Sequence, residues 1–205
     1  MFDEKMRLLK DQTFNPLARP LQAIPPWLFS VMGLLVGVAA AIAVWQQLYP
    51  LGFILWFLNR MFDGLDGAVA RTSGTQSDFG GYLDIVIDFV VYALIPIGLA
   101  LGVAETAVAP SALMLSLIFL LSTYYVNAAS WMYLAAILEK RRLGHSDRLT
   151  SITMPTGIIG GTETIIFYTA FIFFPTHLVW LFSLMGLLII FTIFQRLAWA
   201  AHHLL

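Results

Sequence analysis

The chain has 205 residues, of which 60% are hydrophobic and 11% are charged, and its formal net charge is -1. This composition is typical of an integral membrane protein, and it excludes a nucleic-acid-binding protein that relies on a strongly basic surface. Cysteine is absent, which also excludes disulfides and thiolate metal sites.

Two parts are expected along the chain: an N-terminal interfacial segment over residues 1–24 and one membrane domain over residues 25–205. Within residues 1–14, apolar side chains recur at helical spacing with basic residues around them. This pattern predicts a short amphipathic helix that lies in the membrane interface. A frayed, solvated N-terminus is the alternative interpretation.

The membrane domain predicts an all-α fold, a bundle of six transmembrane helices of roughly 20 residues or more each. Prolines lie at or near the start of most of the apolar stretches, where a helix tolerates them. The predicted spans are residues 27–47, 49–73, 78–102, 110–139, 155–173 and 178–200.

Basic residues lie on one side of this predicted layout. All eleven Lys and Arg residues fall before the first span, in the linker between spans four and five, or in the halves of spans two and six that reach the same side. The predicted loops on the other side contain none, and this asymmetry is the positive-inside pattern. It predicts that both termini and the polar residues of spans two and three are cytoplasmic, in a membrane expected to be the bacterial inner membrane.

Four aspartates interrupt the apolar sequence of the second and third spans. Asp63 and Asp66 share one face of a helix, and Asp84 and Asp88 share a face of the next. Because the link between the spans is short, we expect antiparallel neighbours whose carboxylates meet in one pocket. Buried carboxylates are costly without compensation, and oxygen ligands suit Mg²⁺ or Mn²⁺. The pattern therefore predicts a site for one or two metal ions and favours phosphate chemistry.

Neighbouring residues fit the same interpretation. Gly67 and Gly80 lack side chains where a ligand must approach, and the guanidinium of Arg71 is suited to binding a phosphate. Asp78 is expected to be a helix cap or a first-turn residue rather than a ligand. Two other classes of protein also use such carboxylates: a cation or proton transporter, and a membrane prenyltransferase. The latter carries two separated aspartate-rich motifs, and one set is found here.

The spacing of these residues fits the pattern D-x2-D-G-x2-A-R-x8-G-x3-D-x3-D at every fixed position. The matching residues are Asp63, Asp66, Gly67, Ala70, Arg71, Gly80, Asp84 and Asp88. This resembles the signature of the CDP-alcohol phosphotransferase family, and the chain length and predicted spans are similar as well.

The resemblance implies transfer of a substituted phosphate from a CDP-linked lipid, usually CDP-diacylglycerol, to an alcohol, with release of CMP, in phospholipid biosynthesis. It implies that Asp63, Asp66 and Asp84 bind two Mg²⁺ or Mn²⁺ ions, and that Asp88 approaches the metals and acts as general base. It also implies a homodimer and a CDP site formed by Asp63, Asp66, Gly67, Ala70, Arg71 and Gly80.

The acceptor side is less defined by the sequence. Arg141, Arg142 and Arg148 belong to a basic cluster that either binds a phosphorylated acceptor or serves only membrane topology and anionic lipid heads. Glu163, near the start of the fifth span, is expected either to face the acceptor pocket or to pair with an arginine. Asn127 is expected to form a hydrogen bond between helices.

Overall fold

The computed structural model describes residues 14, 16–143 and 157–204, and within these residues all regular secondary structure is helical. The helices are η1 (Arg19–Leu21), α2 (Pro26–Trp45), α3 (Tyr49–Ser73), α4 (Asp78–Val103), α5 (Pro110–Leu143), α6 (Gly161–Phe173), η2 (Pro175–His177) and α7 (Leu178–Leu204). The predicted all-α fold is confirmed. The predicted interfacial helix over residues 1–14 lies almost wholly outside the described residues.

Five of the six predicted spans begin and end within a few residues of a helix, but the predicted start of the fifth at residue 155 is wrong. Helix α6 begins at Gly161, and the segment 157–160 is not helical. That segment contacts α7 instead: the Ile159 N–H donates to Thr192 Oγ1 at 3.1 Å, and Gly157 lies so close to Thr192 that a Cβ would clash. The backbone is therefore non-helical where it contacts α7.

Within the described residues, four helical segments are long and apolar enough to cross a membrane: Pro26–Trp45, Asp78–Val103, Pro110–Arg141 and Pro175–Leu204. The apolar helix α6 is shorter, with 13 residues, and α3 carries the polar signature residues. The structure is therefore that of an integral membrane protein, while the count of six spans stays a prediction.

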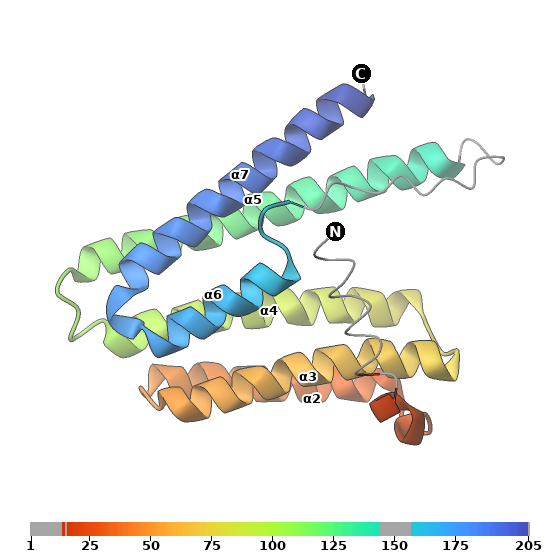
Figure 1. Cartoon of the computed structure of the whole chain (residues 1–205), viewed down its shortest axis with the longest axis horizontal. Helices are drawn as coiled ribbons and strands as arrows, with labels where there is room; N and C mark the ends of the chain where they lie inside the picture. The colour runs from red at the N-terminus through yellow and green to blue at the C-terminus, as the bar shows by residue number, and fades with distance from the viewer. Residues whose placement is uncertain (1–13, 15, 144–156, 205) are drawn as a thin grey trace.

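The helices form two groups joined by α6 (Figure 1). Helix α2 packs against both α3 and α4, α5 packs against α7, and α6 contacts α3, α4 and α7. Helix α2 can approach α4 closely because glycines face it: a Cβ on Gly98 would lie 2.5 Å from the Ala41 carbonyl oxygen. Helices α3 and α4 each pack closely on α2 and make few backbone contacts with each other, and side chains such as Arg60 and Asp88 join them.

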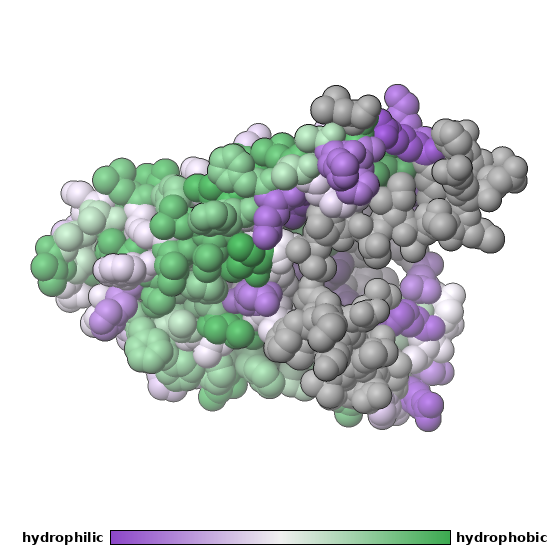
Figure 2. Space-filling view, turned by 45° about the horizontal axis from the view of Figure 1, so that its top comes forward, coloured by the Kyte–Doolittle hydropathy of each residue, from purple (hydrophilic) through white to green (hydrophobic). Residues whose placement is uncertain are grey.

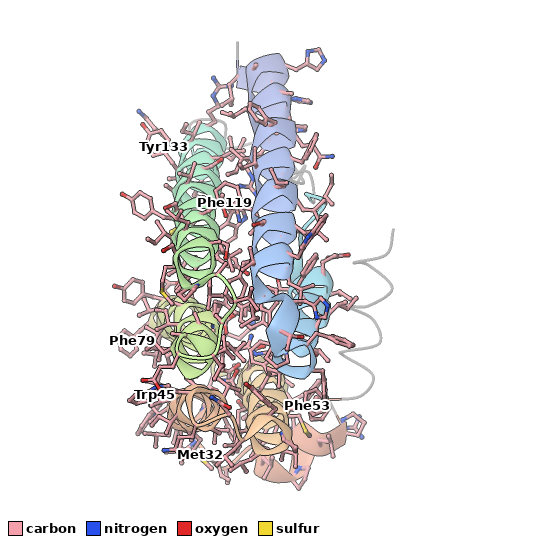
Figure 3. All side chains as sticks on the ribbon, turned by 90° about the vertical axis from the view of Figure 1, so that its left-hand side faces the viewer. Met32, Trp45, Phe53, Phe79, Phe119 and Tyr133 are labelled. Atoms are coloured by element: carbon pink, nitrogen blue, oxygen red, sulfur yellow. The ribbon has the colours of Figure 1, made fainter. Side chains whose placement is uncertain are left out.

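Apolar side chains cover most of the surface. In Figure 2 the hydrophobic residues dominate the end of the molecule that holds the α4–α5 link, and hydrophilic residues gather mostly toward the other end. Met32, Trp45, Phe79 and Tyr133 point outward (Figure 3) and are 40% to 72% exposed. Such a surface suits lipid contact. By contrast, Phe119 points between α5 and α7, where its ring contacts Gly186.

A smaller apolar cluster fixes the segment before α2 to α3. The ring of Phe14 lies against Gly64, and Ala18 is fully buried beside Ala68 and Val69. This packing matters for function because residues 22–25, which follow directly, form one wall of the cavity described below.

We predict that Gly98→Ala destabilises the fold. The added methyl group would overlap the Ala41 carbonyl oxygen, so α2 and α4 must separate, at a cost of about 1–3 kcal/mol. Thermal unfolding in detergent should show a lower midpoint. Gly161→Ala is the matched control, since a Cβ there meets no described atom within 4 Å; an equal loss in both variants would contradict the packing argument.

Candidate active site

The link between α3 and α4 builds the first wall of the site. Gly74 ends α3 in the left-handed conformation, with φ 67°. Ser77 then caps α4, its Oγ accepting from the Gly80 N–H at 3.1 Å. Asp78 follows as a first-turn residue, as predicted. The chain thus reverses within a few residues and brings the two polar helix faces to the same place.

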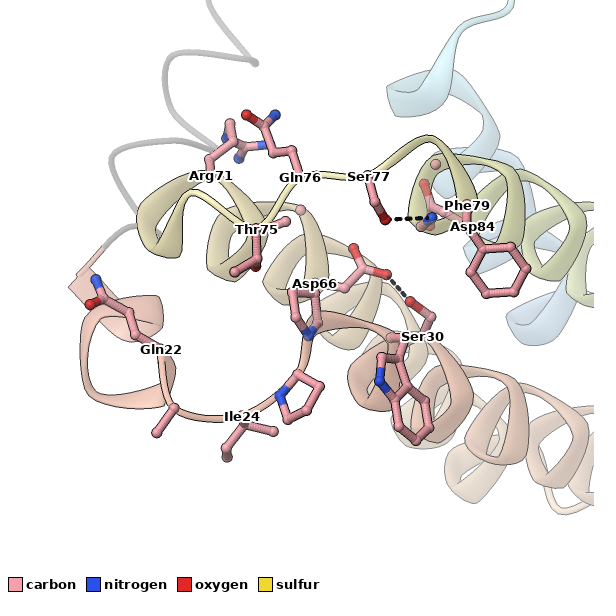
Figure 4. Close-up of a pocket in the computed structure, with 18 residues that line it drawn as sticks. Gln22, Ile24, Ser30, Asp66, Arg71, Thr75, Gln76, Ser77, Phe79 and Asp84 are labelled. Carbon is pink, nitrogen blue, oxygen red and sulfur yellow. Dashed lines mark hydrogen bonds between the residues drawn. The ribbon is translucent and has the colours of Figure 1, made fainter.

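A cavity of ≈ 570 Å³ opens between this link, the start of α2 and residues 22–25 (Figure 4). Six of the eight signature residues line it, and both helices contribute: Asp66, Gly67, Ala70, Arg71, Gly80 and Asp84. These six residues line one cavity, and their roles in a site stay predictions.

Asp66 is the deepest carboxylate of the cavity, with 7% of the residue exposed. The Ser30 hydroxyl, from α2, donates to Asp66 Oδ2 at 2.7 Å (Figure 4). A hydrogen bond to one oxygen orients the carboxylate in the cavity wall. The sequence analysis missed Ser30. A lone serine in an apolar helix carries no signal until the packing of α2 on α3 is known.

Asp63 and Asp88 lie apart from the cavity lining and meet around Arg60. The Arg60 Nη2 donates to Asp88 Oδ1 at 2.8 Å, and its Nη1 lies 3.9 Å from Asp63 Oδ1. Their side chains are 21% and 27% exposed, respectively. The four carboxylates therefore divide into two pairs, an arrangement that the sequence analysis, which expected one pocket, did not predict.

The donor set fits a hard divalent cation in its chemistry, because all four aspartates offer carboxylate oxygens, which such a cation prefers. In the parts of the chain that the structure describes, however, no three acidic or histidine side chains converge closely enough to hold one ion. Asp66 and Asp84 border open space and are the pair best placed to receive a cation.

The predicted acceptor residues have other contacts. Arg141 donates to the carbonyl oxygens of His203 and Leu204, at 3.3 and 2.8 Å, and so caps the end of α7. Glu163 accepts from the Gly160 N–H at 3.0 Å and caps the start of α6, a contact that neither interpretation of this residue anticipated. The side chain of Arg142 and all of Arg148 lie outside the described residues.

A buried cation on α7 was not singled out as a site residue. Arg196 is 8% exposed and donates to both the backbone and side-chain oxygens of Asn127 on α5. The predicted interhelical hydrogen bond of Asn127 is thus confirmed. Among the described residues, the Arg196 Nε has no hydrogen-bond partner.

The sequence pattern that defines CDP-alcohol phosphatidyltransferases matches residues 23–201, which include every residue of the cavity wall except Gln22. The chain belongs to the CDP-alcohol phosphatidyltransferase family. It is accordingly a transferase of phospholipid biosynthesis embedded in a membrane. Membership favours this activity over the transporter and the prenyltransferase that the aspartates alone left open.

Individual relatives of this CDP-alcohol phosphatidyltransferase agree with that assignment. The inner membrane protein YnjF of Escherichia coli (strain K12) is 31% identical over 97% of this chain and 92% of the relative. The archaetidylinositol phosphate synthase of Pyrococcus horikoshii is 38% identical over 38% of this chain and 42% of its own length.

The fold has a counterpart among solved structures. A phosphatidylinositol phosphate synthase of Mycobacterium tuberculosis, crystallised with manganese and citrate, superimposes with a TM-score of 0.72. The match covers 90% of this chain and 87% of that chain, at 22% sequence identity. This likeness extends the agreement to the arrangement of the helices.

Proposed function

We propose that the enzyme transfers a phosphatidyl group from a CDP-linked lipid, such as CDP-diacylglycerol, to an alcohol and releases CMP, with Mg²⁺ or Mn²⁺ as cofactor. The observation that carries this proposal is the cavity itself. It is lined by the signature residues of a family that acts on CDP-alcohols, and it lies where α2 and α4 meet the polar end of the molecule.

The cavity suits the two halves of such a donor. Arg71, Gln76 and Ser77 offer hydrogen-bond donors to a phosphate or a nucleotide, and Gly67 and Gly80 leave room for it. Trp27 and Phe79, at its edge, are 52% and 68% exposed and continue into the apolar surface. A lipid donor can therefore place its nucleotide in the cavity while its acyl chains stay in the bilayer.

Asp63, Asp66 and Asp84 would hold the cofactor, and Asp88 would border it. Two such ions would neutralise charge on the phosphate under attack and on the CMP leaving group. The solved relative that contains manganese supports a metal in this fold.

The chain's own residues then supply the proton transfer and the orientation. The acceptor hydroxyl oxygen attacks the phosphorus of the phosphatidyl group, and its proton passes to Asp88. The bond between that phosphorus and the oxygen of CMP breaks, so the nucleotide leaves. Asp66, oriented by Ser30, fixes one side of the site, and Arg71 holds the departing phosphate.

The proposed acceptor is an alcohol, and the basic residues would favour one that carries a negatively charged phosphate. Relatives include phosphatidylinositol phosphate synthases, and the buried Arg196 of α7 is a further cation besides the basic cluster.

We further propose that the termini and the site are cytoplasmic, because the basic residues concentrate on that side. We also propose that the enzyme is a homodimer, and a measurement of its molar mass in detergent tests this.

We predict that replacing Arg142 and Arg148 together with Gln raises the KM for a phosphorylated acceptor by about tenfold, the loss expected for one charge-assisted contact. The value of kcat should change little, because these residues would bind the acceptor and not the transferred group. Steady-state kinetics at saturating donor would measure both constants. An unchanged KM would assign the cluster to membrane topology.

The proposed function itself is tested by CMP release from purified enzyme in mixed micelles that contain CDP-diacylglycerol and Mg²⁺ or Mn²⁺. The acceptors to compare are glycerol 3-phosphate, inositol, inositol 1-phosphate, serine, choline and none. Release that requires one acceptor and a divalent cation supports the proposal and names the product. Release without any acceptor would indicate hydrolysis, and no release with any of these would contradict this donor.

A further inference from the structure

Arg60 lies between the two aspartates that the cavity does not include, and its contacts are unusually complete. Its side chain is 9% exposed. The Nε and Nη2 donate to Asn59 Oδ1 at 2.9 and 2.7 Å, Nη1 donates to the Tyr92 hydroxyl at 2.9 Å, and Nη2 donates to Asp88 at 2.8 Å. The guanidinium thus has a defined orientation before any substrate binds.

The residues around Arg60 are themselves held in place. Asn59 is 1% exposed, and its Nδ2 donates to the Gly33 carbonyl oxygen of α2 at 2.8 Å. The guanidinium carbon lies 4.9 Å from the Trp56 ring centroid and 5.0 Å from that of Tyr92, so two aromatic rings contact the guanidinium. Tyr168 packs against both rings. With these contacts, the Arg60 side chain has little freedom to change its orientation.

A rigid arginine has two consequences for the aspartates beside it. It holds Asp88 by Oδ1, which fixes the direction of the second oxygen. It also provides a permanent positive charge next to Asp63 and Asp88, so the two carboxylates can lie close together. A residue needed only to join α3 to α4 would require the ion pair but not the fixed orientation that Asn59 and Tyr92 impose.

We infer that Arg60 is a positioning residue for the transfer reaction: it orients Asp88 toward the acceptor hydroxyl and balances the charge of the Asp63–Asp88 pair. This inference rests on the proposed function, in which Asp88 takes the acceptor proton. It assigns Arg60 no contact with substrate. Its effect on the reaction passes through Asp88.

The variants Arg60→Met and Arg60→Lys separate charge from orientation. We expect Arg60→Met to lower kcat for CMP release by about 100-fold, with the donor KM within about twofold of wild type, because a charge-assisted contact to the base is lost. Arg60→Lys restores the charge without the fork of donors, so kcat should recover by about tenfold. Arg19→Met, a change at an exposed arginine of η1, should match wild type.

A second measurement does not depend on turnover. Thermal unfolding in detergent is followed with a chelator and then with Mn²⁺. Without the arginine, the carboxylate pair loses its fixed counter-charge, so Mn²⁺ should raise the midpoint more in Arg60→Met than in wild type or in Arg60→Lys. An equal rise in all three would overturn the charge-balancing role.

Other outcomes also decide the inference. A wild-type kcat in Arg60→Met would overturn it. An equal loss of kcat in the Met and Lys variants, with an unchanged response to Mn²⁺, would also overturn it and would indicate a purely structural contact between α3 and α4. If Arg60→Met does not fold, Tyr92→Phe removes one contact to the guanidinium and keeps the charge; an unchanged kcat there would overturn the orienting role. Failure of wild type to release CMP would contradict the proposed function, while the Mn²⁺ comparison would still test the charge balance.

Discussion

Asp66→Asn is expected to abolish turnover while the protein still folds. Asparagine has nearly the same shape, and its side-chain oxygen can still accept from the Ser30 hydroxyl, so the packing of α2 on α3 should persist. The negative charge that would hold the cation is lost, at a cost of several kcal/mol in the transition state, or about a thousandfold in kcat. Asp84→Asn should behave alike, since Asp84 borders the same cavity.

Three measurements check this expectation: the rate of CMP release, the affinity for Mn²⁺ by electron paramagnetic resonance, and thermal unfolding. Ser30→Ala is the graded control, because it keeps the Asp66 carboxylate and removes only the hydrogen bond that orients it; about 10–100-fold weaker Mn²⁺ binding is expected there. Full activity in Asp66→Asn or Asp84→Asn would contradict the metal assignment.

Asp88→Asn should leave donor binding intact and remove the transfer step. The Asn oxygen can still accept from the Arg60 Nη2, so the contact between α3 and α4 is retained. An amide cannot take the proton of the acceptor hydroxyl, and loss of a general base typically lowers kcat by about 10²–10⁴-fold. Donor KM, measured by CMP release at saturating acceptor, should stay near the wild-type value.

Asp78→Asn is the matched control for this variant. Asp78 is an exposed aspartate in the first turn of the same helix and lies outside the cavity lining. It should retain wild-type kcat and KM. Normal turnover in Asp88→Asn would remove the general-base role, and a large rise in donor KM would assign Asp88 to donor binding instead.

The helices and most of their ends were predictable because their signals are local. A run of apolar residues long enough to span lipid must satisfy its backbone hydrogen bonds internally, so it forms a helix wherever proline and glycine permit. Those signals also predicted the α3–α4 link. The start of α6 was not predicted in this way: residues 157–160 contact Thr192, far along the chain, and the helix begins only after them.

The candidate site was likewise predictable only in part. The fixed spacing from Asp63 to Asp88 was enough to indicate a metal site and phosphate chemistry, because one helical face carries residues three or four apart. The nucleotide was implied only by the resemblance to the family signature. The spacing of residues along two helices does not give the distance between the helices. Helices α3 and α4 pack more closely on α2 than on each other, and the carboxylates divide between the cavity and Arg60.

By itself, the sequence determined that this is a helical membrane protein with an aspartate signature for phosphate transfer, since burial cost and helical periodicity act on residues close in the chain. Only the tertiary structure decided which neighbour each charged group has. Ser30 orients Asp66, Arg60 holds Asp88, and Arg141 and Glu163 cap helices. Each of these partners depends on the distance and rotation between elements, which no local pattern encodes.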